Sequence, residues 1–402
     1  MTDIVRPDIP GRATDDLFTP GQPPEPGMVP GVEAMEADDE AHAIYVAPNW
    51  KLVWWRFKKH RLAMISGVVV CVIALIAIAP GFFATLDPEE TKSSRLFIPV
   101  QRLHFVHDGR LGVYIYGVEG ARNPVSLRME WQIDPDRVIP LALFRPGYSY
   151  EILGLFESDL HLIGLADSES DAEFHILGTD RLGRDQWSRL MYGTQVSLSI
   201  GLVAVAISTI LGIILGGISG YFGGTVDMII QRLIEILQSL PAIPVWLALT
   251  AALPRTWTVE QVYFAITVIL ALIGWTTLAR EIRGRFLALR EEDFVIAAKL
   301  TGSSEARIVF RHMVPTLYSH IIAAVTLAIP VMIINETFLS FLGLGLRPPA
   351  ISWGVLLQEA QNLQSIALAP WLLLPGVAVI ITVLALNILG DGLRDAADPY
   401  SH

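Results

Sequence analysis

Six runs of predominantly apolar residues dominate the pattern along the chain. Each run is at least eighteen residues long, and about 20 residues rising about 1.5 Å each are needed to cross the hydrocarbon of a bilayer. Such runs are typical of membrane-spanning helices. The sequence therefore predicts an all-α membrane protein with six transmembrane helices, at Leu62–Leu86, Val196–Tyr221, Met228–Leu253, Gln261–Leu278, Leu317–Leu342 and Pro370–Leu389.

The interval between the first two runs, residues 87–174, has a different pattern. Apolar and polar residues alternate over Arg102–Tyr116 and Ser126–Ile133, which is the period of a half-buried strand. We expect an extracytoplasmic insertion of mostly-β character between helices 1 and 2. Residues typical of turns and breaks punctuate it, at Asp108-Gly109, Glu119-Gly120, Pro135 and Pro146-Gly147.

Charge along the chain predicts its orientation in the membrane. Residues 1–45 hold seven prolines and ten acidic residues against two arginines, a composition typical of a disordered tail. Residues 46–86 begin with five Lys/Arg beside Trp54, Trp55 and Phe57, which predicts a cytoplasmic interfacial helix before the first span. The loop at residues 280–315 carries seven Lys/Arg and falls on the same side after four spans, and all six spans return the C-terminus to that side. Both termini are therefore expected in the cytoplasm.

Composition excludes several classes of protein. With 52% hydrophobic and 17% charged residues, the 402-residue chain is not a soluble enzyme with one large core. Its net charge of −11 gives no basic patch for nucleic acid, and no metal-ligand or catalytic constellation stands out. No Gly-x-x-x-x-Gly-Lys-[Ser/Thr] phosphate loop occurs, so ATP is not expected to bind this chain in that way. The single cysteine, Cys71, lies in the first apolar run and allows no intrachain disulfide.

The basic loop contains two short amphipathic helices. Phe294, Ala297, Ala298 and Leu300 can share one face, and Gly302 ends that helix. Ser303 or Ser304 can cap the second helix, which is expected to extend to His312, and Pro315 marks the entry to the next span. A long, helical and half-apolar loop of this kind indicates a protein partner.

Polar and small residues inside the spans suggest packing and a pathway. Arg232 and Glu235 share a helix face, followed by Gln238, and charged groups in a membrane pair or face water. We favour a local salt bridge lining an inner vestibule over direct substrate contact. Small residues at every fourth position let a neighbouring helix approach, within this chain or from a second subunit; they are Ala204, Ser208, Gly212, Gly216, Gly220 and Gly224.

Three stretches carry a family resemblance. The loop spacing Ala297-Ala298, three residues, Gly302, nine residues, then His312 to Pro315 resembles the cytoplasmic coupling loop of ABC-importer permeases. The run from His175 to Leu198, with Gly178, Gly183 and Gly193 and the charges Asp180, Arg181, Arg184 and Asp185, resembles the second permease subunit of dipeptide, oligopeptide and nickel importers, as do Glu336–Gly354 and the tail Gly390–Pro399.

The resemblance implies a permease core over residues 175–402, with the coupling loop at 280–315 and an outer-face segment at 343–369. It implies a multi-pass protein of the bacterial inner membrane that forms half of a peptide pathway by alternating access. Oligosaccharides or nickel are alternative cargoes. Its expected partners are a homologous permease, two ATPase subunits that bind ATP and magnesium, and an extracytoplasmic binding protein. A secondary transporter or channel, and a membrane-anchored enzyme or sensor, are the alternatives from other classes.

The resemblance and the residue pattern together nominate three groups of site residues. ATPase coupling is expected from Phe294, Ile296, Ala297, Ala298, Gly302, Arg307, His312 and Pro315. Docking of the binding protein at the outer face is expected from Asp180, Arg184, Asp185, Glu336 and Trp353. The pathway candidates are Arg232, Glu235 and Gln238.

Overall fold

The computed structural model describes residues 49–107, 110–125, 129–167 and 172–397. The predicted tail at 1–45, the Asp108-Gly109 turn and Ser126 lie outside these residues. The chain divides into two compact units, Met1–Leu52 and Val53–His402. The second unit contains the spans and the insertion, and its arrangement is described below. Helix α2 (Asn49–Lys59) crosses the boundary between the two units.

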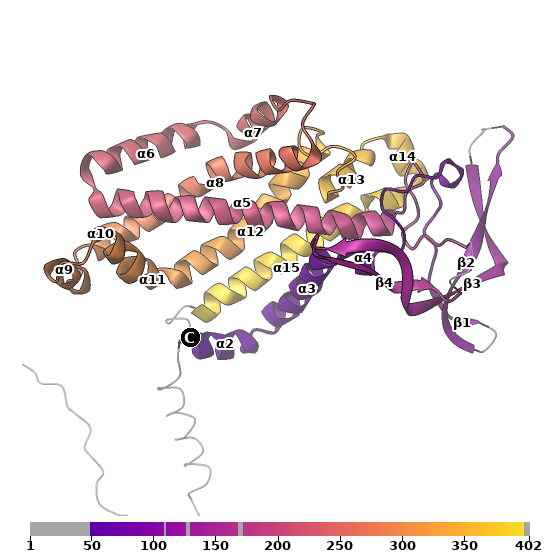
Figure 1. The fold of residues 1–402 in the computed structure, drawn as a ribbon, viewed down its shortest axis with the longest axis horizontal. Helices are drawn as coiled ribbons and strands as arrows, with labels where there is room; N and C mark the ends of the chain where they lie inside the picture. The colour runs from indigo at the N-terminus through magenta and orange to yellow at the C-terminus, as the bar shows by residue number, and fades with distance from the viewer. Residues whose placement is uncertain (1–48, 108–109, 126–128, 168–171, 398–402) are drawn as a thin grey trace, which may run out of the picture. The chain divides into compact units, whose positions relative to one another are not determined.

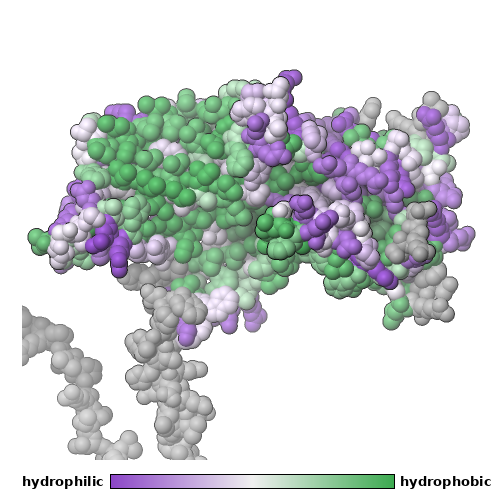
Figure 2. Space-filling view, in the orientation of Figure 1, coloured by the Kyte–Doolittle hydropathy of each residue, from purple (hydrophilic) through white to green (hydrophobic). Residues whose placement is uncertain are grey.

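Within the described residues, five helices are long and apolar enough to cross a membrane, or six if one bent pair counts as a single span. The prediction of a helical membrane protein is confirmed, and Figure 2 shows hydrophobic side chains gathered over these helices. The single helices are α3 (Arg61–Ile78), α5 (Gln186–Phe222), α8 (Val259–Leu289), α12 (Tyr318–Phe341) and α15 (Leu374–Ala397), which the short η3 (Pro370–Leu373) precedes.

The third predicted span is not one helix. Helices α6 (Gly224–Ser239) and α7 (Ala242–Ala251) meet at an angle of 84°. Pro241 lies at the bend, where its ring fixes φ and removes the N–H that a continuous helix needs. The first span is also shorter than expected: α3 ends at Ile78, and the short α4 (Pro80–Phe83) follows.

The stripe of small residues faces α8. A Cβ added at Gly212 would lie 3.1 Å from Leu278, and one at Gly216 would lie 2.5 Å from the carbonyl oxygen of Ala279. Gly220 meets α8 one turn further on, whereas Gly224 has open space around it. Most of the stripe therefore packs helices of this chain together, the first of the two expected uses.

The insertion contains a small four-stranded antiparallel sheet within residues 104–165, in the order β1-β2-β3-β4. Its core includes Ile115, Ile139 and Leu141. Several expected breaks were wrong: Glu119-Gly120 lies inside β2, and Pro135 and Pro146-Gly147 lie inside β3. Register shifts between Tyr116 and Gly117 and between Pro146 and Tyr150 absorb the irregularity without ending the strands. The strands are β1 (His104–His107), β2 (Arg110–Arg122), β3 (Met129–Ile152) and β4 (Phe156–Leu165).

The basic loop and the sheet lie at opposite ends of α5 (Figure 1). At one end, Lys299 Nζ lies 5.1 Å from the ring centroid of Tyr221. At the other end, the Tyr148 hydroxyl donates to the Tyr192 hydroxyl over 3.3 Å. The remaining short elements are η1 (Ser93–Arg95), α9 (Asp293–Leu300), α10 (Glu305–Arg307), the π-helix η2 (Ile308–Met313), α11 (Val314–Thr316), α13 (Trp353–Glu359) and α14 (Leu363–Leu368).

Candidate functional site

The basic loop is anchored to the bundle by a compact apolar cluster. Val295 on α9 and Ile308 and Met313 on η2 are buried, and they pack in one cluster with Ile282 and Phe286 at the end of α8. Burial of this kind fixes short helices that would not be stable alone in water. The loop is therefore a rigid extension of α8 and α12.

The other side of the loop exposes apolar residues. Phe294, Ile296, Leu300 and Phe310 are exposed, with Leu300 at 83%. Ala297 and Arg307 are also exposed, while His312 and Pro315 are half-buried. The expected common face of α9 was wrong in one respect: Ala298 turns inward beside Val295, whereas Phe294, Ala297 and Leu300 face outward. Grouped apolar exposure of this kind is typical of a surface that contacts a membrane or another protein.

Gly302 makes the break between α9 and α10. Its φ of 77° lies in the left-handed region, which glycine adopts without steric cost. The N–H of Ser303 bonds to the carbonyl of Ala298 over 3.1 Å, which closes the end of α9. Ser304 is the N-cap of α10 but makes no side-chain cap hydrogen bond. A Cβ at Gly302 would meet nothing within 4 Å, so the break faces open space.

A charged cavity lies between α6 and α8. Arg283 donates to the carboxylate of Asp227 through Nε at 2.5 Å and Nη2 at 2.6 Å. The cavity has a volume of about 480 Å³, and Arg232 and Glu235 also line it. These two side chains are exposed and form a 2.8 Å ion pair, the local salt bridge that the sequence favoured. Gln238 donates to the hydroxyl of Thr276 over 3.1 Å.

The charged residues of the His175–Leu198 run form a buried network. Arg184 donates to Asp180 at 2.7 Å and to Glu359 of α13 at 2.5 Å, and Arg189 lies 3.7 Å and 3.8 Å from the same carboxylates. The pKa of Glu359 is raised, first because its carboxyl is buried and second because Asp180 repels its charge. Attraction to Arg184 and Arg189 offsets part of this rise. Arg181, between Asp180 and Arg184 in the sequence, is exposed, and its charge also lowers the pKa of Glu359.

Glu336 occupies a second buried polar centre. The hydroxyls of Ser197 and Ser340 donate to its carboxylate at 3.1 Å and 2.9 Å. The N–H of Trp353 donates to Ser197 over 3.1 Å, so α5, α12 and α13 meet here.

Burial corrects the expected docking role of this group. Asp180, Arg184, Asp185, Glu336 and Trp353 are all buried within the chain itself. A binding protein therefore has no direct access to these side chains in this conformation. Their contacts instead join α13 to α5, α12 and the segment before α5.

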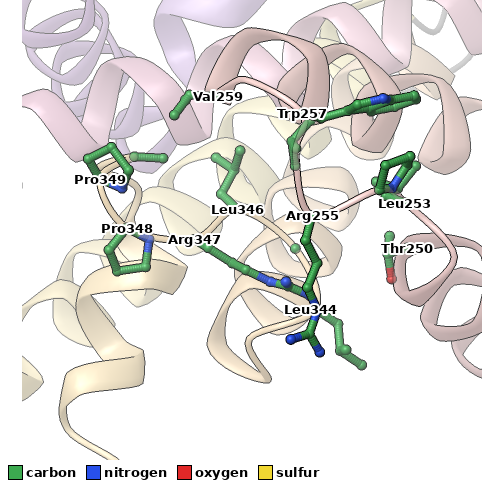
Figure 3. Close-up of a pocket in the computed structure, with 14 residues that line it drawn as sticks. Thr250, Leu253, Arg255, Trp257, Val259, Leu344, Leu346, Arg347, Pro348 and Pro349 are labelled. Carbon is green, nitrogen blue, oxygen red and sulfur yellow. The ribbon is translucent and has the colours of Figure 1, made fainter.

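A different pair of residues offers charge at this end of the bundle. Arg255 and Arg347 line a cavity of about 250 Å³ between the end of α7 and the segment after α12. In Figure 3 their side chains extend toward one another, and no Asp or Glu is among the fourteen described residues that line the cavity. Sequence reasoning missed this pair, although each arginine lies within five residues of the end of a predicted span and could have been noticed there.

Comparison with known proteins places these features in a family. Residues 183–400 match the family model described as binding-protein-dependent transport system inner membrane component. Residues 49–99 match the N-terminal TM domain of oligopeptide transport permease C.

Named permease proteins are also similar to this chain. The oligopeptide transport system permease protein OppC of Bacillus subtilis (strain 168) is 34% identical over 266 residues, covering 65% of this chain and 82% of the relative. The dipeptide transport system permease protein DppC of the same organism is 40% identical over 228 residues, covering 56% and 68%. The glutathione transport system permease protein GsiD of Pectobacterium atrosepticum is 36% identical over 233 residues, covering 58% and 75%.

Proposed function

Because the chain belongs to the family of binding-protein-dependent transport system inner membrane components, we propose that it is the permease of an ATP-driven peptide importer. In this role it forms half of the pathway, and a homologous permease forms the other half. Two ATPase subunits bind ATP and magnesium, and a binding protein delivers the substrate from outside. The observation that carries this proposal is the rigid loop at 293–316 with its exposed apolar side.

The exposed apolar side of the loop is suited to transmit movement of the ATPases to the membrane helices. Phe294, Ile296 and Leu300 enter a groove on an ATPase subunit, and Gly302 allows the tight break between the two short helices. Since the buried face of the loop is packed on α8, movement of the ATPases at ATP binding is passed to α8. Helix α5 moves with it, because Gly216 and Gly220 bring the two helices into close contact. The pathway then alternates between its two openings.

The polar cavity beside α6 fits the inner part of this pathway. Arg232 and Glu235 line it as an exposed pair, which is suited to a wetted vestibule and carries no information about substrate. The outer cavity with Arg255 and Arg347 offers positive charge to acidic groups of the binding protein. Selection of the peptide is assigned to the binding protein.

The orientation is that of the positive-inside rule, with both termini in the cytoplasm. A cysteine introduced at Leu111 should react with an impermeant thiol reagent on intact cells, in a background where Cys71 is replaced by alanine. A cysteine at Leu300 should react only after the membrane is opened. The reverse pattern would reject this orientation.

The experiment that tests the function uses Gly302→Leu. Leucine cannot adopt the left-handed backbone without strain, and its side chain occupies the space open to a partner. We expect normal insertion but weak association of the ATPases and little uptake of radiolabelled peptide in proteoliposomes containing the whole complex. Full association and uptake would leave the segment as an ordinary loop. Uptake of oligosaccharide or nickel in place of peptide by the unmodified complex would correct the substrate class.

A further inference from the structure

The turn between β3 and β4 exposes several large apolar side chains. Leu153, Leu155 and Phe156 are exposed, with Leu155 at 74%, and together with Gly154 they form what we call the hairpin tip. Leu153 and Gly154 have φ values of 53° and 68°, so the backbone makes a tight turn that leaves these side chains outside the sheet. Soluble surfaces rarely gather apolar residues in this way without a partner.

The hairpin is clamped to the end of the first span. The Nδ1 atom of His161 on β4 lies 2.7 Å from the carbonyl oxygen of Gly81 in α4. The Tyr150 ring of β3 packs so closely on the same glycine that an added Cβ would lie 2.3 Å from it. Because Tyr148 also bonds to Tyr192 of α5, the hairpin is held against α5 and against α4, which directly follows α3. Figure 1 shows it curving from the sheet back toward α4 and the bundle.

This clamp places the tip near the edge of the hydrocarbon. Helix α3 has 18 residues, so it is about 27 Å long, close to the thickness of a bilayer core. Its last residue, Ile78, is exposed, and α4 begins two residues later. Phe144 of β3 is also exposed and lies 6.2 Å from Phe82 between ring centroids. Exposed apolar side chains thus continue from the C-terminal end of α3 to the hairpin, and Figure 2 shows a hydrophobic cluster bordering the helices there.

We propose that the hairpin tip inserts into the membrane interface beside α3, and that its occupant is lipid. Residues 147–160 contain no Lys or Arg, and the exposed carboxylates of Glu151 and Glu157 flank the tip. Attraction to anionic headgroups therefore contributes nothing, and entry of the tip into the membrane interface depends on apolar side chains alone.

The sequence segment that contains the sheet lies between the two matched family segments, of which one ends at residue 99 and the other begins at residue 183. The membrane contact is a feature added to the permease core.

Spin labels at matched leucines test the proposal in the complete complex, reconstituted in lipid nanodiscs. Cys71 is first replaced by alanine, and a cysteine is then introduced by Leu155→Cys or, as the control, by Leu111→Cys. Leu111 is 88% exposed and lies near the β1–β2 connection of the same sheet. Collision of the label with oxygen, which concentrates in lipid, is compared with collision with a water-soluble nickel chelate.

We expect the label at residue 155 to collide more with oxygen than with the nickel chelate, and the label at 111 to show the opposite preference. Replacing neutral lipid by anionic lipid should change neither result. Equal aqueous exposure at both positions would overturn the proposal. A label at 155 that is shielded from both reagents would also overturn it, because the tip would then be covered by a partner subunit.

Discussion

Arg283 holds Asp227 by two hydrogen bonds of 2.5 Å and 2.6 Å, and this contact joins the end of α8 to the start of α6. The hydroxyl of Ser219 on α5 also donates to Asp227. One carboxylate therefore fixes three helices close to the loop that we assign to the ATPases. A displacement of α8 is passed to α6 and its cavity through this contact.

Asp227→Ala removes this link. We expect the free energy of unfolding to fall by about 1.5–3 kcal/mol, the usual range for hydrogen bonds to charged groups. Thermal unfolding of the purified permease measures the change. Arg232→Ala is the control, because its ion pair with Glu235 is exposed on both sides and should contribute less than about 1 kcal/mol. Equal losses for both variants would refute the special role of Asp227.

Gly216→Leu should separate α5 from α8. A Cβ at this position would already lie 2.5 Å from the backbone of Ala279, so a larger side chain must push the two helices apart. We predict loss of the folded complex on size-exclusion chromatography. Gly284→Leu is the matched control on α8, since Gly284 is exposed and an added Cβ there meets nothing within 4 Å. Normal assembly of the Gly216 variant would contradict the packing argument.

Glu359→Ala should destabilise the outer face. Its removal leaves Arg184 and Arg189 buried with one carboxylate between them, and breaking a buried pair costs about 3–5 kcal/mol. Glu359→Gln keeps hydrogen-bond acceptance and should lose less. Chemical denaturation in detergent distinguishes the two. Glu291→Ala serves as an exposed control, and a loss at Glu359 no larger than this control would show that the network is dispensable.

The arginine pair at the outer cavity should act on the binding protein. For the double variant Arg255→Gln and Arg347→Gln, we expect the concentration of binding protein that half-stimulates ATP hydrolysis to rise about tenfold, equivalent to about 1.4 kcal/mol. Hydrolysis without binding protein should not change. Arg102→Gln removes an exposed arginine of the insertion and is the control. An unaltered titration in the double variant would exclude this cavity from docking.

Local chemistry made much of the loop predictable. Gly302 marked the helix break because a left-handed residue is needed there, and the apolar positions around it indicated two short amphipathic helices. The π-helix at Ile308–Met313 was not foreseen. Pro315 follows it and has no N–H to continue the regular hydrogen-bond ladder, so the preceding turn widens.

Contacts between residues far apart in the sequence could not be predicted for the buried charged network. The sequence shows that Asp180 and Arg184 are close enough to pair, and they do. It does not show that Glu359, 175 residues further on, completes the network and buries it. The residues nominated for docking are therefore internal, whereas Arg255 and Arg347 line a separate cavity.

Two leucines of nearly equal exposure test whether the apolar side of the basic loop binds the ATPases. Leu300 on the loop is 83% exposed, and Leu363 on the outer-face α14 is 82% exposed. Each is changed to aspartate, and the ATPase subunits retained by the tagged permease are quantified. We expect Leu300→Asp to lose most of the retained ATPase and Leu363→Asp to keep it. Full retention by Leu300→Asp would contradict the claim.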